Sequence, residues 1–255
     1  MIQAVLLGSG TSNGVPMLGV HYLPEFLENP KNHRTRSSLL LKGPGGNVLI
    51  DCAPEMRIQL LREHIYELEA TIITHTHADH IMGMDDLRSF CITQRRPMPV
   101  YTLPRYQEDI RRIFPYAFQE FPAGIEVPRF DLHEMPEFLE IAGMKIESMI
   151  VDHGPIPVIG LRIGDFGYLT DVSHIPPEAE AKLQNLETLI LDAVRYAPHP
   201  NHFHYEAAIH AAKRLGAKKT YFTHLSHDYD HDKVNAELPT GIELAFDGLV
   251  VQVGD

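Results

Sequence analysis

Short apolar runs along this chain end repeatedly in a histidine or an aspartate, and this pattern limits the possible folds more than any other feature of the sequence. Each run has the length and the aliphatic content of a β-strand, and the polar residue comes at or just after its end. The residues are Asp51, His75, His153, Asp171, Asp192 and His224. Because all six polar side chains come at strand ends, we expect them to lie together at one edge of a sheet structure, where loops form a site.

The order of the expected elements indicates an α/β fold. Strands are expected at 3–8, 37–43, 47–52, 70–75, 144–153, 158–164, 168–171, 188–193 and 220–224, and helices at 55–66, 104–114, 176–185 and 205–215. Strands precede helices in both halves, which favours an αββα sandwich, with two mixed sheets face to face and helices outside, over a doubly wound sheet. Because no repeat or linker-like segment interrupts the chain, we expect one domain over 1–255.

Composition narrows the class of function. There are 34 acidic residues against 22 lysines and arginines, a net charge of −12, which disfavours binding to nucleic acid through bulk charge. The 16 histidines favour metal ligation or proton transfer, whereas the two cysteines indicate neither a disulfide framework nor a thiolate zinc site. The first apolar run stops at Gly8 and no stretch is long enough to span a bilayer. We therefore expect a soluble, cytoplasmic protein with no membrane partner.

The densest group of potential ligands is the segment HTHADH, residues 75–80. In a loop that leaves a strand, residues two apart can turn to the same ion, while the following pair points to a neighbouring position. A single histidine is more often a surface or core residue than a ligand. Three histidines and an aspartate within six positions at a strand end are not explained in that way, so the segment predicts a metal site with one or two ions.

This segment resembles the HxHxDH signature of the metallo-β-lactamase fold hydrolases, and the resemblance covers nearly the whole chain. The family takes further ligands from later strand ends, and the matching positions occur here in the expected order: His153 in IVDHG, Asp171 in YLTDVS and His224 in YFTHLSHD. His227 is the alternative to His224, but only His224 directly follows an apolar strand. The resemblance implies two metal ions, bridged by Asp171. It assigns His75, His77 and His153 to one ion, and Asp79, His80 and His224 to the other.

Five further segments resemble the PhnP-like branch, the phosphoribosyl cyclic phosphodiesterases. They are GSGTSNGVP at 8–16, RTRSSLLL at 34–41, LIDCAPEMR at 49–57, GMDDLRSF at 83–90 and THLSHDYDH at 223–231. The resemblance implies a phosphodiesterase with two Zn²⁺ or Mn²⁺ ions that hydrolyses a small cyclic or linear phosphodiester through a metal-bridging hydroxide. Two ions about 3.5–4 Å apart can also hold the attacking and the leaving oxygen. Homodimers are common among the relatives, so a homodimer is possible.

Two other functions remain as alternatives. Ribonuclease Z shares the GTS and HxHxDH segments, but an RNA-processing nuclease of that type would need a basic arm, and the chain has no long insertion rich in lysine and glycine. This interpretation therefore disfavours nucleic acid as a partner. A metal-binding protein with a degenerate site is the third possibility, and the complete ligand set argues against it.

Residues 17–33 depart from the branch. Typical members carry a cysteine-rich zinc knuckle soon after the first strand, whereas this segment, MLGVHYLPEFLENPKNH, has no cysteine. His21 and His33 could form a poorer metal site with Glu25 or Glu28. Solvent-exposed loop histidines are the default interpretation.

A phosphodiesterase needs an acid to protonate the leaving oxygen. The segment YAPHPNHFHY offers His199, His202 and His204, and the resemblance selects His202, with His204 as the second choice. The expected catalytic residues are therefore His202 and Asp79. By the same resemblance, Asp51 is expected to order the HTHADH loop through hydrogen bonds, as carboxylates behind metal ligands commonly do.

No substrate-binding residue is assigned from the sequence. Asp85, Asp86 and Arg88 could bind a phosphate or a sugar, but an internal ion pair at a helix start is the favoured interpretation. For Arg34 and Arg36 we favour loop anchoring over substrate binding.

Overall fold

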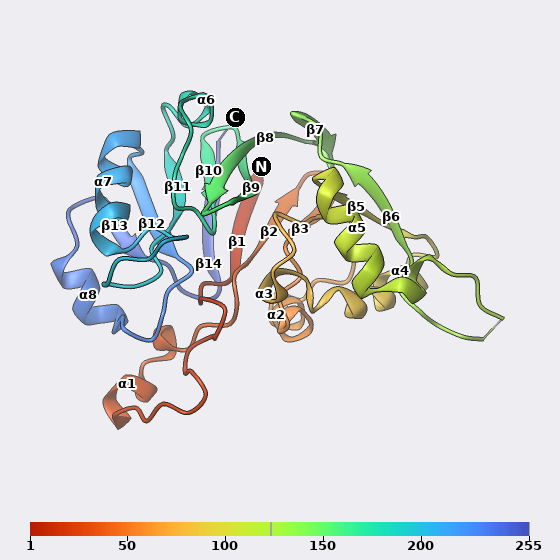
Figure 1. Ribbon diagram of the computed structural model, residues 1–255, viewed down its shortest axis with the longest axis horizontal. Helices are drawn as coiled ribbons and strands as arrows, with labels where there is room; N and C mark the ends of the chain where they lie inside the picture. Colours follow the sequence, from red (N-terminus) through yellow and green to blue (C-terminus); the bar gives the residue numbers. More distant parts are fainter. Residues whose placement is uncertain (123, 255) are drawn as a thin grey trace.

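Two seven-stranded sheets pack face to face in the computed structural model, which describes residues 1–122 and 124–254 (Figure 1). The first sheet has the order β14 (Leu249–Val253), β1 (Ile2–Gly8), β2 (Ser38–Gly43), β3 (Gly46–Ile50), β4 (Ala70–Ile72), β5 (Met98–Thr102) and β6 (Phe130–Glu134). The second has the order β13 (Ile242–Leu244), β12 (Lys219–Thr223), β11 (Thr188–Asp192), β10 (Phe166–Leu169), β9 (Ile156–Ile163), β8 (Met144–His153) and β7 (Phe138–Ile141).

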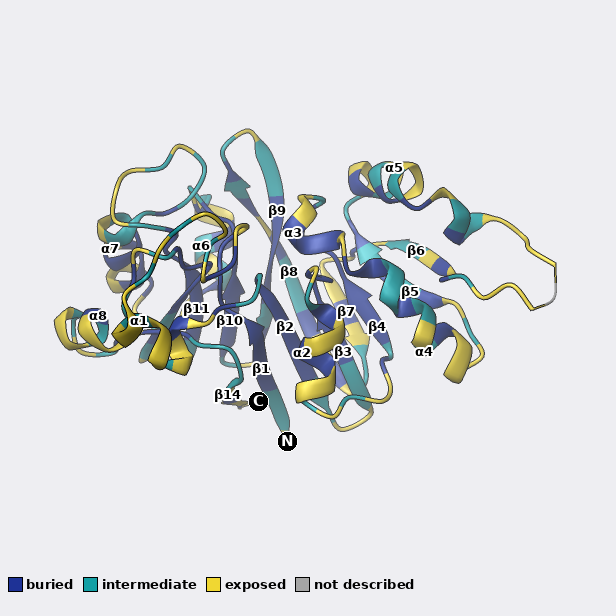
Figure 2. Ribbon diagram, turned by 90° about the horizontal axis from the view of Figure 1, so that it is seen from below, coloured by how far each residue is buried: buried dark blue, intermediate teal, exposed yellow. Residues whose placement is uncertain are grey.

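Most of the helices pack against the sheets, but the first one in the chain has no buried residue and projects away from them (Figure 1). The helices are α1 (Pro24–Glu28), α2 (Met56–Arg62), α3 (Ala78–Ile81), α4 (Arg88–Thr93), α5 (Pro104–Ile113), α6 (Pro177–Lys182), α7 (Tyr205–Leu215) and α8 (His231–Glu237), with 3-10 turns at Pro30–Asn32, Met84–Leu87 and Pro115–Phe118. Figure 2 shows the buried strands in the middle of the molecule and the exposed helix faces outside. The predicted αββα sandwich is confirmed. None of the helices in the described part of the chain is long and apolar enough to cross a bilayer.

Three apolar layers hold these elements together. One lies between the sheets and includes Leu41, Ile50 and Leu161. The second joins the second sheet to α6, α7 and α8, and the third joins the first sheet to α2, α4 and α5. Each aliphatic side chain that is fully buried in these layers contributes roughly 1.5–3 kcal/mol. The layers fix the two sheets relative to each other, and with them the strand ends.

Sheet topology explains why the polar residues meet. Strands β3 to β6 are parallel to one another, as are β10 to β13, and the carboxyl ends of parallel neighbours lie at one edge. Asp51 and His75 leave the first sheet at this edge, and Asp171, Asp192 and His224 leave the second. His153 is the last residue of β8.

Some elements differ from the sequence-based expectation. The helix expected at 55–66 ends at Arg62, since His64 takes a φ of 54°, which an α-helix does not accommodate. The strand expected at 70–75 ends at Ile72, and the chain then forms the loop that carries HTHADH. Strands β5, β6, β7, β13 and β14 were not predicted. β14 pairs with β1 at the other end of the chain, so it has no local partner that a sequence pattern would reveal.

Candidate metal centre

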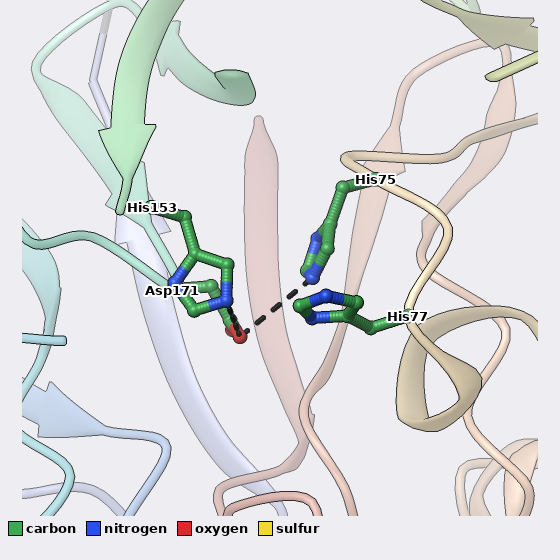
Figure 3. Close-up of side chains that lie close together, drawn as sticks. All are labelled: His75, His77, His153 and Asp171. Atoms are coloured by element: carbon green, nitrogen blue, oxygen red, sulfur yellow. Dashed lines mark ion pairs between the residues drawn. The ribbon is translucent and has the colours of Figure 1, made fainter. Parts of the chain in front are cut away.

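The seven residues expected as ligands lie together in two groups. His75, His77, His153 and Asp171 form one group, and the other consists of Asp79, His80, Asp171 and His224; within each, the ligand atoms lie within 4.8 Å of one another. In Figure 3, His75 and His77 point from the loop after β4 toward His153 and Asp171, which come from the second sheet. Both sheets therefore contribute to the centre.

Asp171 lies between the two groups. Its Oδ2 atom is 3.7 Å from His75 Nε2 and 3.9 Å from His153 Nε2. Its Oδ1 atom is 3.3 Å from His80 Nε2 and 3.1 Å from His224 Nδ1. One carboxylate thus presents one oxygen to each group, which is the arrangement that a bridging ligand needs.

Two buried ring nitrogens without hydrogen-bond partners fit metal ligation. His75 Nε2 and His80 Nε2 are buried and have no hydrogen-bond partner among the described residues. Their other ring nitrogens do have partners, since His75 Nδ1 lies 3.1 Å from Thr74 Oγ1 and His80 Nδ1 lies 2.7 Å from Asp51 Oδ2. An unpaired buried nitrogen is costly, and a coordinated cation removes that cost. Imidazoles and carboxylates without a thiolate suit Zn²⁺ or Mn²⁺.

Burial prepares most of the ligands for a cation. It lowers the pKa of His75, with a further contribution from His80, and it lowers the pKa of His224. Burial alone would raise the pKa of Asp171, but His224 and His80 hold that pKa well below its usual value. Neutral imidazoles and an ionised carboxylate are the protonation states that bind a divalent metal.

His80 is the exception among the histidines. Burial lowers its pKa, but the surrounding carboxylates of Asp171, Asp79 and Asp51 together raise it well above the usual value. The pKa of Asp79, which burial would raise, is held low chiefly by His80. Because a metal needs the free lone pair of Nε2, metal binding competes with the proton on His80.

Asp51 lies beneath the HTHADH loop and is fully buried. Its Oδ1 accepts a hydrogen bond of 2.8 Å from the backbone N–H of Thr74, while Oδ2 contacts His80. Asp51, Asp171 and His224 all take a positive φ, between 53° and 61°, a conformation that non-glycine residues seldom adopt. Such backbone strain at three strand ends is typical of functional sites.

His202 reaches the centre from the loop between β11 and α7. Its Nε2 atom lies 4.0 Å from Asp171 Oδ2, and its ring stacks on His224 with 4.9 Å between centroids. Its Nδ1 atom donates to Asp192 Oδ2 at 2.8 Å. Burial lowers the pKa of His202, but the Asp192 carboxylate raises it more, to about 9. The raised pKa favours the protonated form of His202, and its Nε2 faces the two groups.

Asp192 was expected at the strand-end edge from the sequence, but no role was assigned to it. Its only signal was its place at the end of an apolar strand, which it shares with the ligands. Thr170 was missed, and its hydroxyl donates to Asp171 Oδ1 at 2.6 Å. The main-chain carbonyl of Asn201, which accepts from His153 Nδ1 at 2.6 Å, has no side-chain signature at all.

The other histidines of this loop lie differently. His204 is the residue before α7. Within residues 1–122 and 124–254, its side chain belongs to neither ligand group. The ring of His199 lies 4.8 Å from that of His202. His202, rather than His204, is thus next to the proposed metal ligands.

The basic residues singled out in the sequence have internal partners. Arg34 is buried and donates to the carbonyls of Ser226 and Tyr229, while Arg36 pairs with Glu55. The favoured interpretation of loop anchoring agrees with these contacts.

Asp85 and Arg88 form an ion pair of 2.7 Å, as favoured from the sequence. In the 17–33 segment, His33 Nε2 contacts the carbonyl of Leu27 at 2.8 Å. Neither ligand group found in the described residues includes this segment.

The chain matches one family model in sequence and superposes on one solved structure with a high TM-score. Residues 46–225 match the model of the family described as the Beta-lactamase superfamily domain. The crystal structure of a diphosphatase from the PhnP family superposes with a TM-score of 0.92 at 37% sequence identity, covering 100% of this chain and 98% of that one.

Two relatives are named for different activities. Ribonuclease Z from Alkaliphilus oremlandii is 25% identical over 249 residues, 88% of this chain and 69% of that enzyme. An octanoyltransferase from Porphyromonas gingivalis is 35% identical over 253 residues, which are 97% of this chain but 51% of that protein. The chain therefore spans about half the length of the octanoyltransferase.

Proposed function

Because the chain belongs to the metallo-β-lactamase superfamily of metal-dependent hydrolases and to its PhnP-like branch, we propose that it is a dinuclear phosphodiesterase that acts on a small phosphodiester. The observation that carries this proposal is the position of Asp171. Its two oxygens face two separate ligand groups, and His202 Nε2 lies 4.0 Å from one of them. A double metal site beside a protonated imidazole suits hydrolysis of a phosphate ester.

In this proposal each ligand group holds one divalent ion, Zn²⁺ or Mn²⁺. His75, His77 and His153 hold the first, Asp79, His80 and His224 hold the second, and Asp171 contacts both. When bound, the ions supply Lewis-acid chemistry, because they offset phosphate charge and lower the pKa of water.

His202 protonates the leaving oxygen. Its Nε2 faces the ligand groups, while Asp192 holds Nδ1 and so fixes the ring orientation. Asp79 is the second catalytic residue, since its buried and ionised carboxylate can accept a hydrogen bond from the attacking water.

A diphosphate is the second candidate substrate. The PhnP-family neighbour is described as a diphosphatase, and it shares 37% identity with this chain over its whole length. An RNA precursor is less favoured, since the net charge is −12 and ribonuclease Z is the more distant relative.

A substrate panel tests the proposal. It compares bis(p-nitrophenyl) phosphate, a ribosyl 1,2-cyclic phosphate, a 2′,3′-cyclic nucleotide, a dinucleoside diphosphate, a tRNA precursor and a lactone with metal-loaded protein. We expect turnover of at least one small phosphodiester. Cleavage of the tRNA precursor alone would support the ribonuclease alternative, and turnover of the lactone alone would contradict phosphoester chemistry.

A pair of variants tests the assignment of the acid. His202→Ala should reduce phosphodiester turnover by about 10²–10⁴-fold and leave the metal content intact. If His204→Ala has this effect and His202→Ala is silent, the proton donor is His204.

A further inference from the structure

The loop between β11 and α7 carries a local concentration of basic side chains in an otherwise acidic protein. Arg195, His199 and His202 lie within eight positions, whereas the whole chain has a net charge of −12. The proposed acid, His202, accounts for only one of these three. Arg195 and His199 have no part in the mechanism described above.

Hydrogen bonding gives His199 a defined tautomer. Its Nδ1 atom accepts a hydrogen bond of 3.1 Å from the backbone N–H of Asn201. Burial lowers the pKa of His199, and the neighbouring His202 and Arg195 lower it further. Because Nδ1 accepts this hydrogen bond, the neutral ring, which the lowered pKa favours, carries its proton on Nε2 and offers Nε2–H as a donor.

Arg195 places a positive charge beside this donor. Its Nε atom donates to the carbonyl of Ala197 at 3.2 Å and its Nη2 to that of Pro198 at 2.8 Å, so the guanidinium lies across the loop. Within the part of the chain that the structure describes, Arg195 takes part in none of the recorded ion pairs with carboxylates. Its charge is thus available to an anion.

The position of His202 indicates which part of a substrate would contact His199 and Arg195. The ring of His202 lies 4.4 Å from that of the proposed ligand His153 and 4.8 Å from that of His199. If His202 protonates the leaving oxygen, the remainder of the leaving group lies beside the His202 ring. The ring of His199 adjoins that of His202, and Arg195 is close enough to His199 to lower its pKa.

We propose, on the basis of the proposed function, that Arg195 and His199 form a subsite for an anionic leaving group, the second phosphate of a diphosphate substrate. In the reaction, a water oxygen bonds to one phosphorus, and the bond from that phosphorus to the bridging oxygen breaks. The bridging oxygen keeps the electron pair and takes a proton from His202, and the proton released by the water restores the acid. The products are two phosphate monoesters, one of them held by His199 and Arg195.

Two substrates separate this subsite from the general reaction. A dinucleoside 5′,5′-diphosphate has a leaving phosphate, whereas bis(p-nitrophenyl) phosphate releases p-nitrophenolate, which has none. His199→Phe should lower kcat/KM for the diphosphate at least tenfold more than for bis(p-nitrophenyl) phosphate, mainly through KM, since a hydrogen bond to a charged group is lost. His199→Gln retains an N–H donor and should recover most of the difference. His210→Gln is the matched control, because His210 is exposed on α7 and should leave both activities unchanged.

A binding measurement provides a readout that does not depend on turnover. Calorimetric titration with a methylene-bridged dinucleoside diphosphate analogue, which cannot be hydrolysed at the bridge, should show binding that weakens about tenfold or more in His199→Phe and recovers in His199→Gln. Metal content should equal that of the wild type in both variants.

Three results would overturn the subsite. The first is an equal loss of kcat/KM for both substrates in His199→Phe, and the second is unchanged binding of the analogue. The third is a loss of metal in His199→Phe, because His199 would then only position the loop. If metal-loaded wild type turns over neither substrate, the proposed function is wrong, and the analogue titration still decides whether the anion subsite exists.

Discussion

Asp192 Oδ2 lies 2.8 Å from Nδ1 of His202 and also accepts a hydrogen bond of 2.9 Å from the backbone N–H of Val172. Since Val172 directly follows Asp171, one buried carboxylate joins the proposed acid to the segment that carries the proposed bridging ligand. The relative position of His202 and Asp171 therefore depends on Asp192.

Asp192→Asn should impair protonation of the leaving group. The amide cannot hold the His202 ring with a charge-assisted hydrogen bond, so we expect turnover to fall by roughly 10–100-fold for substrates with poorly acidic leaving groups. The loss should be smaller for p-nitrophenyl esters, whose leaving group needs no proton. Steady-state kinetics on the two substrate types checks this. Equal losses for both types, or a lower metal content, would show that Asp192 acts on the metal centre instead.

Asp171→Asn should remove metal as well as activity. One carboxylate serves both ligand groups, so its neutral amide is expected to lower the metal content from close to two ions per chain to one or fewer. Elemental analysis of protein purified without chelators measures this. A wild-type value near zero would rule out the dinuclear centre, and a variant that retains two ions would exclude Asp171 as the bridge.

Gly154→Ala should weaken metal binding from outside the ligand set. A Cβ atom at Gly154, where φ is +57°, would lie 2.3 Å from Asn201 Oδ1, and the carbonyl of Asn201 holds His153. We expect about 10–100-fold weaker metal affinity, measured by competition with a chelator. Gly216→Ala is the matched control, since Gly216 has a similar φ of +68° and no atom within 4 Å of its added Cβ. Equal metal affinity in the two variants would disprove the steric mechanism.

His231→Gln should change how stability responds to acid. His231 is 2% exposed, and burial, with Lys31 and Arg34, lowers its pKa from 6.5 to about 4. The unfolded chain therefore binds more protons between these values, so the histidine destabilises the fold as pH decreases from about 6.5 to 4, by at most about 1.4 kcal/mol per pH unit.

Urea unfolding at pH 7.5, 6 and 5 measures this effect. The free energy of unfolding of His231→Gln should decrease less steeply than that of the wild type, whereas His210→Gln, at an exposed position, should follow the wild type. Parallel curves for His231→Gln and the wild type would mean that His231 is not held neutral by its surroundings.

Residue type and local pattern determined much of this protein. Runs such as TLILD and KTYFT predict strands from their composition alone, and the polar residue at each strand end indicated a site at one sheet edge. The HTHADH segment predicted metal chemistry because its residues are neighbours in sequence. The two strands are confirmed, because strand formation depends largely on residues within a few positions, whereas metal binding by HTHADH stays a prediction.

Only the tertiary structure decided which distant residues act on one another. The packing of the two sheets and the register of their parallel strands determine three sets of contacts. These are the hydrogen bond between Asp192 and His202, the hydrogen bond between the Asn201 carbonyl and His153, and the contacts of Asp171 with both ligand groups. The unusual positive φ of Asp171 and His224 is likewise imposed by the fold. Side-chain identity is local and can be read from the sequence, but the orientation of a carboxylate or an imidazole is set by packing between elements far apart in the chain.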